Sequence, residues 1–122
     1  MQENLGRHVL LDLYDCSKEK LNDLVFLEKQ LKKAVEIAEA TLVNTLFHQF
    51  SPHGVTGIAL IEESHLSIHT WPEHNYAAID LFTCSDSMKT TEAVSFLVEQ
   101  LESKRQETRD VKRGLISNTD LS

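Results

Sequence analysis

The chain has 122 residues, a length that supports one hydrophobic core rather than two, so we expect a single domain spanning residues 1–122. Hydrophobic residues make up 41% and charged residues 25%, close to globular averages, which argues against a disordered tail, a collagen-like repeat or a coiled-coil rod. The formal net charge of −7 disfavours non-specific binding to nucleic acid or to anionic lipid.

The sequence gives no sign of a membrane span or an export signal. No apolar stretch approaches the ~18–20 residues that a spanning helix needs, and Met1–Leu10 has no basic region followed by an apolar one. We therefore expect a soluble cytoplasmic protein that does not contact a membrane. Its two cysteines, Cys16 and Cys84, are too few for a disulfide scaffold and are expected to be reduced thiols.

Hydrophobic periodicity predicts two helices and six strands. Apolar residues recur every three or four positions in Lys18–Ala40, where Ser17 or Asp15 can cap the start, and again in about Met88–Ser103. The strands, recognised by a period of two or by β-branched apolar runs, are Leu5–Tyr14, Thr41–Phe50, Val55–Glu62, His65–Trp71, Tyr76–Cys84 and about Arg105–Lys112. Their order, β-α-β-β and then β-β-α-β, is symmetric about Glu63-Ser64.

Several predicted strands are apolar on both faces, as in Tyr76–Cys84, so each face of the sheet needs cover. Two helices can cover only one face. We therefore predict an α/β fold, a two-layer sandwich of a mainly antiparallel sheet with two helices on one face. The other face is expected to pack against a second copy of the chain in a homodimer.

A basic patch near the C-terminus runs against the acidic average. Residues 104–113 carry five basic and two acidic side chains, a net charge of +3. Between a solvated edge strand, kept from edge-to-edge pairing by its charge, and an RNA contact, the first interpretation is favoured.

Six histidines raise the question of a metal site. His65 and His69 lie four residues apart on a predicted strand, which separates their Cα atoms by about 13 Å, too far to share an ion. The sequence also lacks the His-Glu-x-x-His and paired Cys-x-x-Cys patterns of common zinc sites. We expect no bound metal.

The stretch Glu62–Glu73 is the most distinctive segment. It reads Glu-Glu-Ser-His-Leu-Ser-Ile-His-Thr-Trp-Pro-Glu, which places Glu63-Ser64 at a tight turn, His69 five residues beyond the serine, and Trp71-Pro72-Glu73 at a strand end. A serine and a histidine at this spacing do not by themselves define a chemistry, since a capped turn beside an ordinary strand histidine looks the same.

Longer motifs carry a resemblance to a known family. Along nearly its whole length the chain resembles the small prokaryotic S-adenosylmethionine decarboxylase proenzymes, whose fold is an α/β sandwich that dimerises. The resemblance rests on Leu5–His8, Phe47–Pro52, Gly54–Gly57, Glu63–Glu73 and Ala78–Cys84.

The resemblance implies a cofactor made from the chain itself. Ser64 would attack the carbonyl of Glu63 and convert the peptide bond to an ester, whose β-elimination and hydrolysis leave chains 1–63 and 64–122, the second beginning with a pyruvoyl group. His69 matches the residue that assists this processing. Thr56 stands where the family usually has a processing Ser, and Ser85 where Gly is common; the β-branched side chain of Thr56 restricts its rotamers and is expected to slow cleavage.

The resemblance also implies the reaction. The pyruvoyl ketone would form a Schiff base with S-adenosylmethionine and accept the electrons left by departing carbon dioxide, giving the aminopropyl donor of spermidine biosynthesis. Cys84 matches the proton donor to the substrate. Phe50 and Trp71 would sandwich the adenine and Glu73 would bind the ribose hydroxyls, contacts that suit a flat base beside a sulfonium charge.

Two other functions remain open from the sequence. A relative with the same pyruvoyl chemistry could decarboxylate ornithine or arginine. A catalytically silent homologue could act as a regulatory subunit, although the presence of Ser64, His69 and Cys84 together argues against it.

Overall fold

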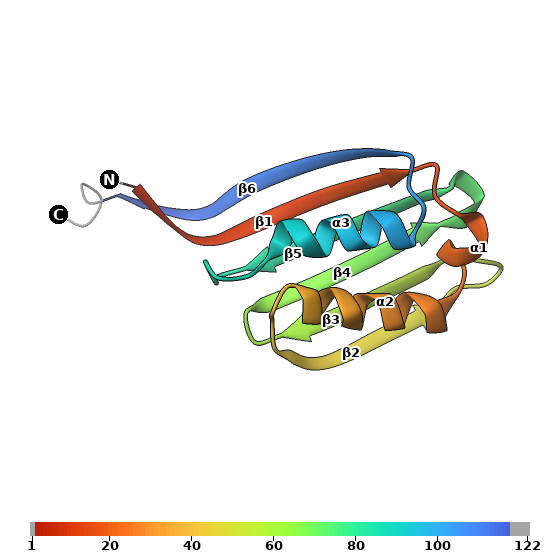
Figure 1. Cartoon of the computed structure of the whole chain (residues 1–122), viewed down its shortest axis with the longest axis horizontal. Helices are drawn as coiled ribbons and strands as arrows, with labels where there is room; N and C mark the ends of the chain where they lie inside the picture. The colour runs from red at the N-terminus through yellow and green to blue at the C-terminus, as the bar shows by residue number, and fades with distance from the viewer. Residues whose placement is uncertain (1, 118–122) are drawn as a thin grey trace.

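The computed structural model describes residues 2–117, which form a single six-stranded sheet in the order β2-β3-β4-β5-β1-β6 (Figure 1). Every neighbouring pair of these strands is antiparallel. The strands are β1 (Gln2–Tyr14), β2 (Leu42–Gln49), β3 (Val55–Ile61), β4 (Ser64–Trp71), β5 (Tyr76–Thr83) and β6 (Arg105–Ser117).

Three α-helices and one 3₁₀ turn connect the strands: α1 (Lys18–Leu21), α2 (Leu24–Ile37), α3 (Thr90–Gln100) and η1 (Pro72–His74). The single helix predicted for Lys18–Ala40 is therefore wrong in one respect, because it breaks at Asn22-Asp23. Asp23 has an extended backbone, and its side chain accepts a hydrogen bond from the backbone N–H of Phe26, so that it caps a new helix. Within residues 2–117, no helix is both long enough and apolar enough to cross a membrane.

The core lies between one face of the sheet and the helices. Figure 1 shows α2 and α3 side by side on the same face of the sheet. Buried leucines of both helices, Leu27, Leu31 and Leu97, join Leu13 of β1 and Ile68 of β4 in one apolar cluster. The predicted α/β sandwich with its helices on one face is confirmed, and the sheet is antiparallel throughout the described residues.

The opposite face of the sheet, which we call the open face, carries no helix of the described chain. Several large apolar side chains stand exposed on it or at its edges, including Leu46 at 73%, Leu60 at 48% and Trp71 at 42% exposure. Exposed apolar surface of this kind is typical of interaction sites. That a second copy covers the open face stays a prediction.

The basic patch lies on an edge strand, as expected. β6 pairs only with β1 among the described strands, and residues 104–115 are exposed along its length. The arrangement agrees with charged side chains that protect a sheet edge from pairing with another chain.

Candidate active site

The expected site residues fall into two groups at opposite ends of β4. Glu63 and Ser64 lie at its start, where Cys84 follows β5. Trp71 and Glu73 lie at its end. We call the first group the scissile turn and the second the nucleoside pocket, after the roles that the sequence suggests.

The scissile turn is a two-residue connection between β3 and β4. The backbone N–H of Glu62 donates to the carbonyl of Thr41 at 2.9 Å, and the N–H of Thr41 donates to Oε1 of Glu63 at 3.0 Å. These two bonds hold the turn against the loop before β2. Ser64 has φ +153°, which non-glycine residues rarely adopt and which costs of the order of 1–3 kcal/mol. The bond between Glu63 and Ser64 is therefore both fixed and strained.

Cys84 contacts the carbonyl oxygen of that same bond. Its backbone N–H donates to the Glu63 carbonyl at 3.1 Å, and its thiol lies 3.3 Å from the same oxygen. Two donors on one carbonyl oxygen polarise the carbonyl and stabilise negative charge that develops on it. The sequence suggested Cys84 only as a later proton donor. The register that pairs Ser64 with Thr83 brings it to the scissile bond.

The nucleoside pocket is a cavity of about 300 Å³ that brings together all three residues expected to bind substrate. It also contains a histidine that sequence analysis did not single out. Its lining residues are Phe50, His53, Gly54, Thr56, His69, Thr70, Trp71 and Glu73.

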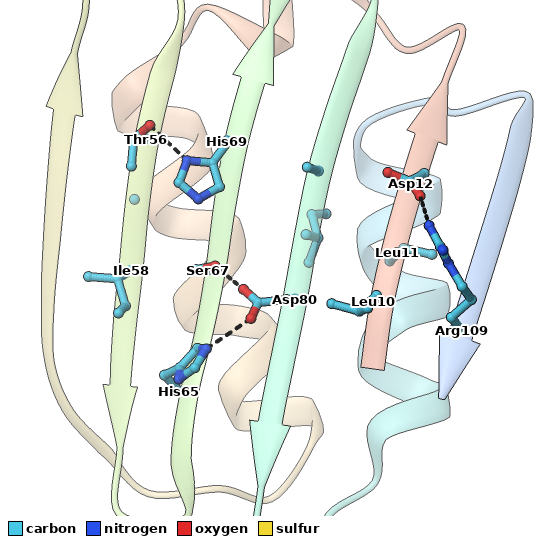
Figure 2. A pocket seen from close by; sticks show the side chains of 13 residues that line it. Leu10, Leu11, Asp12, Thr56, Ile58, His65, Ser67, His69, Asp80 and Arg109 are labelled. Carbon is cyan, nitrogen blue, oxygen red and sulfur yellow. Dashed lines mark hydrogen bonds and ion pairs between the residues drawn. The ribbon is translucent and has the colours of Figure 1, made fainter. Parts of the chain in front are cut away.

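Thr56 and His69 are cross-strand neighbours on the open face (Figure 2). The Thr56 hydroxyl lies 3.0 Å from Nδ1 of His69. His69 is five residues beyond Ser64 on the same strand, about 16 Å away at ~3.3 Å per residue. The structure thus places this pair in the wall of the nucleoside pocket and away from the scissile turn of its own chain.

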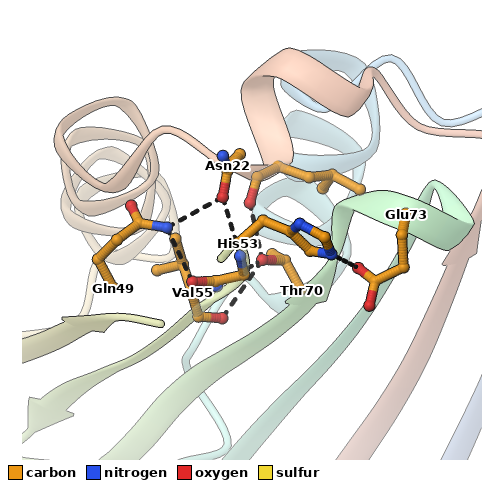
Figure 3. Close-up of polar contacts among 8 residues, drawn as sticks. Asn22, Gln49, His53, Val55, Thr70 and Glu73 are labelled. Carbon is orange, nitrogen blue, oxygen red and sulfur yellow. Dashed lines mark hydrogen bonds and ion pairs between the residues drawn. The ribbon is translucent and has the colours of Figure 1, made fainter. Parts of the chain in front are cut away.

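Hydrogen bonds to the Asn22 side chain fix the loop that carries Phe50 and His53 (Figure 3). The Asn22 side chain accepts from the Gly54 N–H at 2.8 Å and from Nε2 of Gln49 at 2.9 Å. Gly54 has φ +108°, and a Cβ there would lie 3.2 Å from the Thr70 carbonyl oxygen, so glycine suits this close approach. Asn22 is also the residue at which the predicted long helix breaks. The break therefore positions the side chain that holds the loop of the pocket.

Glu73 remains ionised at neutral pH. A hydrogen bond from its own backbone N–H, with the nearby His53 and His74, lowers the pKa of the Glu73 carboxyl and outweighs the opposing effect of burial. An ionised carboxylate only accepts hydrogen bonds, which suits binding of hydroxyl groups.

A third cluster lies in a wider concavity of about 620 Å³ on the open face (Figure 2). Asp80 accepts hydrogen bonds from Ser67, from His65 at 3.0 Å and from Nε2 of His8 at 2.6 Å. Burial alone raises the pKa of the Asp80 carboxyl, but the hydrogen bonds from Ser67, His8 and His65 outweigh it and lower the pKa.

The ligand atoms of His8, His65 and Asp80 lie within 4.8 Å of one another, close enough to be tested as a metal site. No signal in the sequence points to this group, because its three members lie on the separate strands β1, β4 and β5. However, Arg113 donates to Nδ1 of His8 at 3.0 Å, so the proton of that ring lies on Nε2 and faces Asp80. A metal ion would have to displace that proton, and we therefore assign the cluster as a hydrogen-bond network.

Cys16 takes no part in any of these groups. It is buried, and burial raises the pKa of its thiol to about 11. The thiol therefore stays protonated near neutral pH, and it packs in the apolar core.

Comparison with known proteins shows what the chain is similar to. Residues 7–114 match the family model described as S-adenosylmethionine decarboxylase. The S-adenosylmethionine decarboxylase proenzyme of Thermosipho melanesiensis is 48% identical over 112 residues, covering 92% of this chain and 86% of that protein. The proenzyme of Methanococcus maripaludis is 42% identical over 119 residues, covering 98% of each.

A solved structure agrees with these matches. The crystal structure of adenosylmethionine decarboxylase from Aquifex aeolicus superposes with a TM-score of 0.87 at 38% identity, covering 95% of this chain and 96% of that one. The chain belongs to the S-adenosylmethionine decarboxylase family, and the resemblance drawn from its motifs is confirmed.

The Asp80 cluster should contribute to stability in a pH-dependent way. Because the folded pKa is lowered, the contribution of Asp80 is present above the unfolded value of about 3.9 and is lost as pH falls through the folded pKa. We expect Asp80→Asn to lower the free energy of unfolding by about 1–2 kcal/mol at pH 7. Urea titrations at fixed protein concentration measure it, with the exposed Asp86→Asn as control.

The difference between Asp80→Asn and the parent should shrink between pH 4 and pH 2. A difference that stays constant over this range would show that the carboxylate does not stabilise the fold through its charge.

Proposed function

We propose that this chain is the proenzyme of a pyruvoyl-dependent S-adenosylmethionine decarboxylase that cuts itself between Glu63 and Ser64. The family match favours this reaction over decarboxylation of ornithine or arginine and over a catalytically silent role. The observation that carries the proposal is the scissile turn, where a strained Ser64 follows a carbonyl that both the N–H and the thiol of Cys84 contact.

The turn has the groups that self-cleavage needs. The Ser64 hydroxyl attacks the Glu63 carbonyl carbon, and the Cys84 donors stabilise the oxyanion until the peptide C–N bond breaks and an ester forms. Loss of the Ser64 Cα proton then expels the Glu63 carboxylate and leaves a dehydroalanine. Its imine tautomer takes up water and releases ammonia, so that a pyruvoyl group remains at position 64.

The pyruvoyl group supplies an electron sink for the loss of carbon dioxide from an amino acid. The chain's own residues bind the substrate and return a proton. The exposed thiol of Cys84 lies beside position 64 and donates a proton to the substrate Cα. This reaction needs a reduced thiol, which fits a cytoplasmic enzyme.

The nucleoside pocket fits the other half of the substrate. Phe50 and Trp71 are 48% and 42% exposed, so their rings have free surface for stacking on adenine. Glu73 lies in the same pocket and accepts hydrogen bonds from the ribose hydroxyls. Ornithine and arginine offer neither an adenine nor a ribose to these three residues.

The two halves of the site lie too far apart to serve one substrate within one chain. Ser64 and Trp71 are seven residues apart on β4, about 23 Å at ~3.3 Å per residue. Nine single bonds join the amino group of S-adenosylmethionine to its adenine, a span of at most about 12 Å at ~1.5 Å per bond in a zigzag chain. The active enzyme is therefore a homodimer in which the scissile turn of one copy meets the nucleoside pocket of the other.

The open face supports this assembly. It carries Thr56 and His69 together with exposed apolar side chains of β2 and β3, Leu46 and Leu60 among them. Two open faces stacked with their β4 strands antiparallel bury that surface and bring each Ser64 toward the far end of the opposing β4. The same packing brings Thr56 and His69 of one copy toward the scissile turn of the other, where they assist processing.

The first prediction tests self-cleavage. The parent chain should yield fragments of 63 and 59 residues, the second blocked to N-terminal sequencing, because the cut lies before Ser64. Ser64→Ala should stay intact by mass spectrometry, and Ser67→Ala, on the same strand, should still cut. Cleavage of Ser64→Ala at this bond would rule out the serine mechanism.

The second prediction tests whether residues of both copies form each active site. Ser64→Ala and His69→Ala should each stay largely uncut alone. When the two chains are co-expressed with different tags, mixed dimers contain one site with an intact Ser64 opposite an intact His69. The His69→Ala chain should then be cut and the Ser64→Ala chain should not. If co-expression leaves the His69→Ala chain as uncut as it is alone, His69 does not act across a dimer.

The third prediction separates the role of Cys84 in self-cleavage from its role as proton donor in decarboxylation. Cys84→Ala keeps the backbone N–H at the Glu63 carbonyl, so it should still self-cleave, though more slowly. It should lose most decarboxylation, and protonation at the wrong atom should convert its pyruvoyl group to alanine, visible as a mass change on the 59-residue fragment. Full and lasting turnover would require another proton donor.

The fourth tests the substrate. Losing one stacking face costs ~1–3 kcal/mol, so Trp71→Ala should lower kcat/KM for S-adenosylmethionine about ten- to a hundredfold, with Trp71→Phe as the control that keeps a ring. Glu73→Gln should have a comparable effect. Release of carbon dioxide from carboxyl-labelled substrates measures it. Faster release from ornithine or arginine by the parent, unchanged by Trp71→Ala, would overturn the nucleoside assignment.

A further inference from the structure

We propose that His53 is a second ribose-binding residue, which donates a hydrogen bond to one hydroxyl oxygen of the substrate's ribose while Glu73 accepts from the diol. This inference rests on the proposed function, because it assigns a further residue to the nucleoside pocket. His53 lies in the Pro52-His53-Gly54 turn between β2 and β3.

His53 and Glu73 already form a pair in the pocket. Nε2 of His53 lies 3.2 Å from Oε1 of Glu73, and Figure 3 shows the two side chains meeting from different loops. Both line the same cavity as Phe50 and Trp71. Their side chains are 38% and 41% exposed, so a ligand can reach both.

Hydrogen bonds of the neighbouring residue fix the backbone that carries His53. Its neighbour Gly54 is held by Asn22 through its N–H, and its carbonyl accepts from the N–H of Phe50 at 2.8 Å and from Gln49 at 2.9 Å. The loop that presents His53 is thus tied at both ends to β2 and to the α1–α2 junction. Binding residues on a held loop need little reordering when a ligand arrives.

A vicinal diol needs a donor as well as an acceptor. Each ribose hydroxyl donates one hydrogen bond and can accept others, whereas the Glu73 carboxylate only accepts. Nε2 of His53 faces Oε1 of Glu73 in the free protein, and a hydroxyl that displaces this contact, as the exposed Glu73 side chain turns away, can donate to Glu73 and accept from His53. Such a pair recognises one hydroxyl group both as a hydrogen-bond donor and as a hydrogen-bond acceptor.

This geometry predicts discrimination against nucleosides that lack a hydroxyl. A pocket built to hydrogen-bond a hydroxyl rejects the analogue without it, because the polar groups of the pocket then lose their partner. The binding of adenosine, 2′-deoxyadenosine and 3′-deoxyadenosine tests this without any need for catalysis. Trp71 is the only tryptophan of the chain and lies in the pocket, so its fluorescence reports stacking of each nucleoside.

In the self-processed parent, we expect adenosine to bind at least about tenfold more tightly than the analogue that lacks the hydroxyl contacted by His53. In His53→Ala, that preference should fall below about twofold. His53→Gln, which keeps an N–H donor, should retain more of it than His53→Ala does. His74→Ala removes a histidine next to Glu73 in sequence that makes no hydrogen bond to Glu73 among the described contacts, and it should keep the parent's preference.

The outcomes distinguish the two proposals. If adenosine does not bind the parent, the nucleoside pocket itself is refuted. If adenosine binds the parent but His53→Ala keeps the parent's preference over both analogues, His53 is no ribose ligand and the proposed function stands. If His53→Ala no longer binds adenosine at all, His53→Gln decides, since a preference no greater than twofold in that variant would also overturn the inference.

Discussion

The hydrogen-bond register of β4 with its two neighbours sets the position of the groups around the scissile turn and of the Thr56–His69 pair. Pairing with β5 places Ser64 opposite Thr83, which brings the next residue, Cys84, to the Glu63 carbonyl. Pairing with β3 places Thr56 opposite His69. A shift of one residue in either pairing would turn these side chains to the other face of the sheet and separate the donors from the scissile carbonyl.

The same sheet divides its faces between folding and function. The helices bury one face, where the packing of leucines and isoleucines supplies the stability. The open face holds polar groups that would be costly to bury without partners, and Asp80 meets that cost with hydrogen bonds from three side chains. Exposed apolar residues of β2 and β3, Leu46 and Leu60 among them, leave this face suited to another protein surface.

Strain and rigidity have separate places along β4. The unusual φ of Ser64 stores strain at the bond that we propose is cut, held by the contacts of Glu62 and Glu63 with Thr41. The far end of the strand leads into a pocket whose loop is tied down by Asn22. Distortion makes a bond easier to break, whereas preorganisation lets a pocket bind its ligand more tightly. Because β4 is long, one end of it can carry the strained bond and the other end can lead into the rigid pocket.

The sequence by itself determined the strands and the helical face, because apolar periodicity is a local feature, and the resemblance of its motifs to a known family pointed to the candidate residues. Only the tertiary structure decided how those residues are grouped. The contact of Cys84 with Glu63, the pairing of Thr56 with His69, and the meeting of His53 with Glu73 all join separate segments of the chain and depend on strand register or loop packing. Spacing along a sequence carries no information about such contacts, because they arise from the packing of the whole sheet.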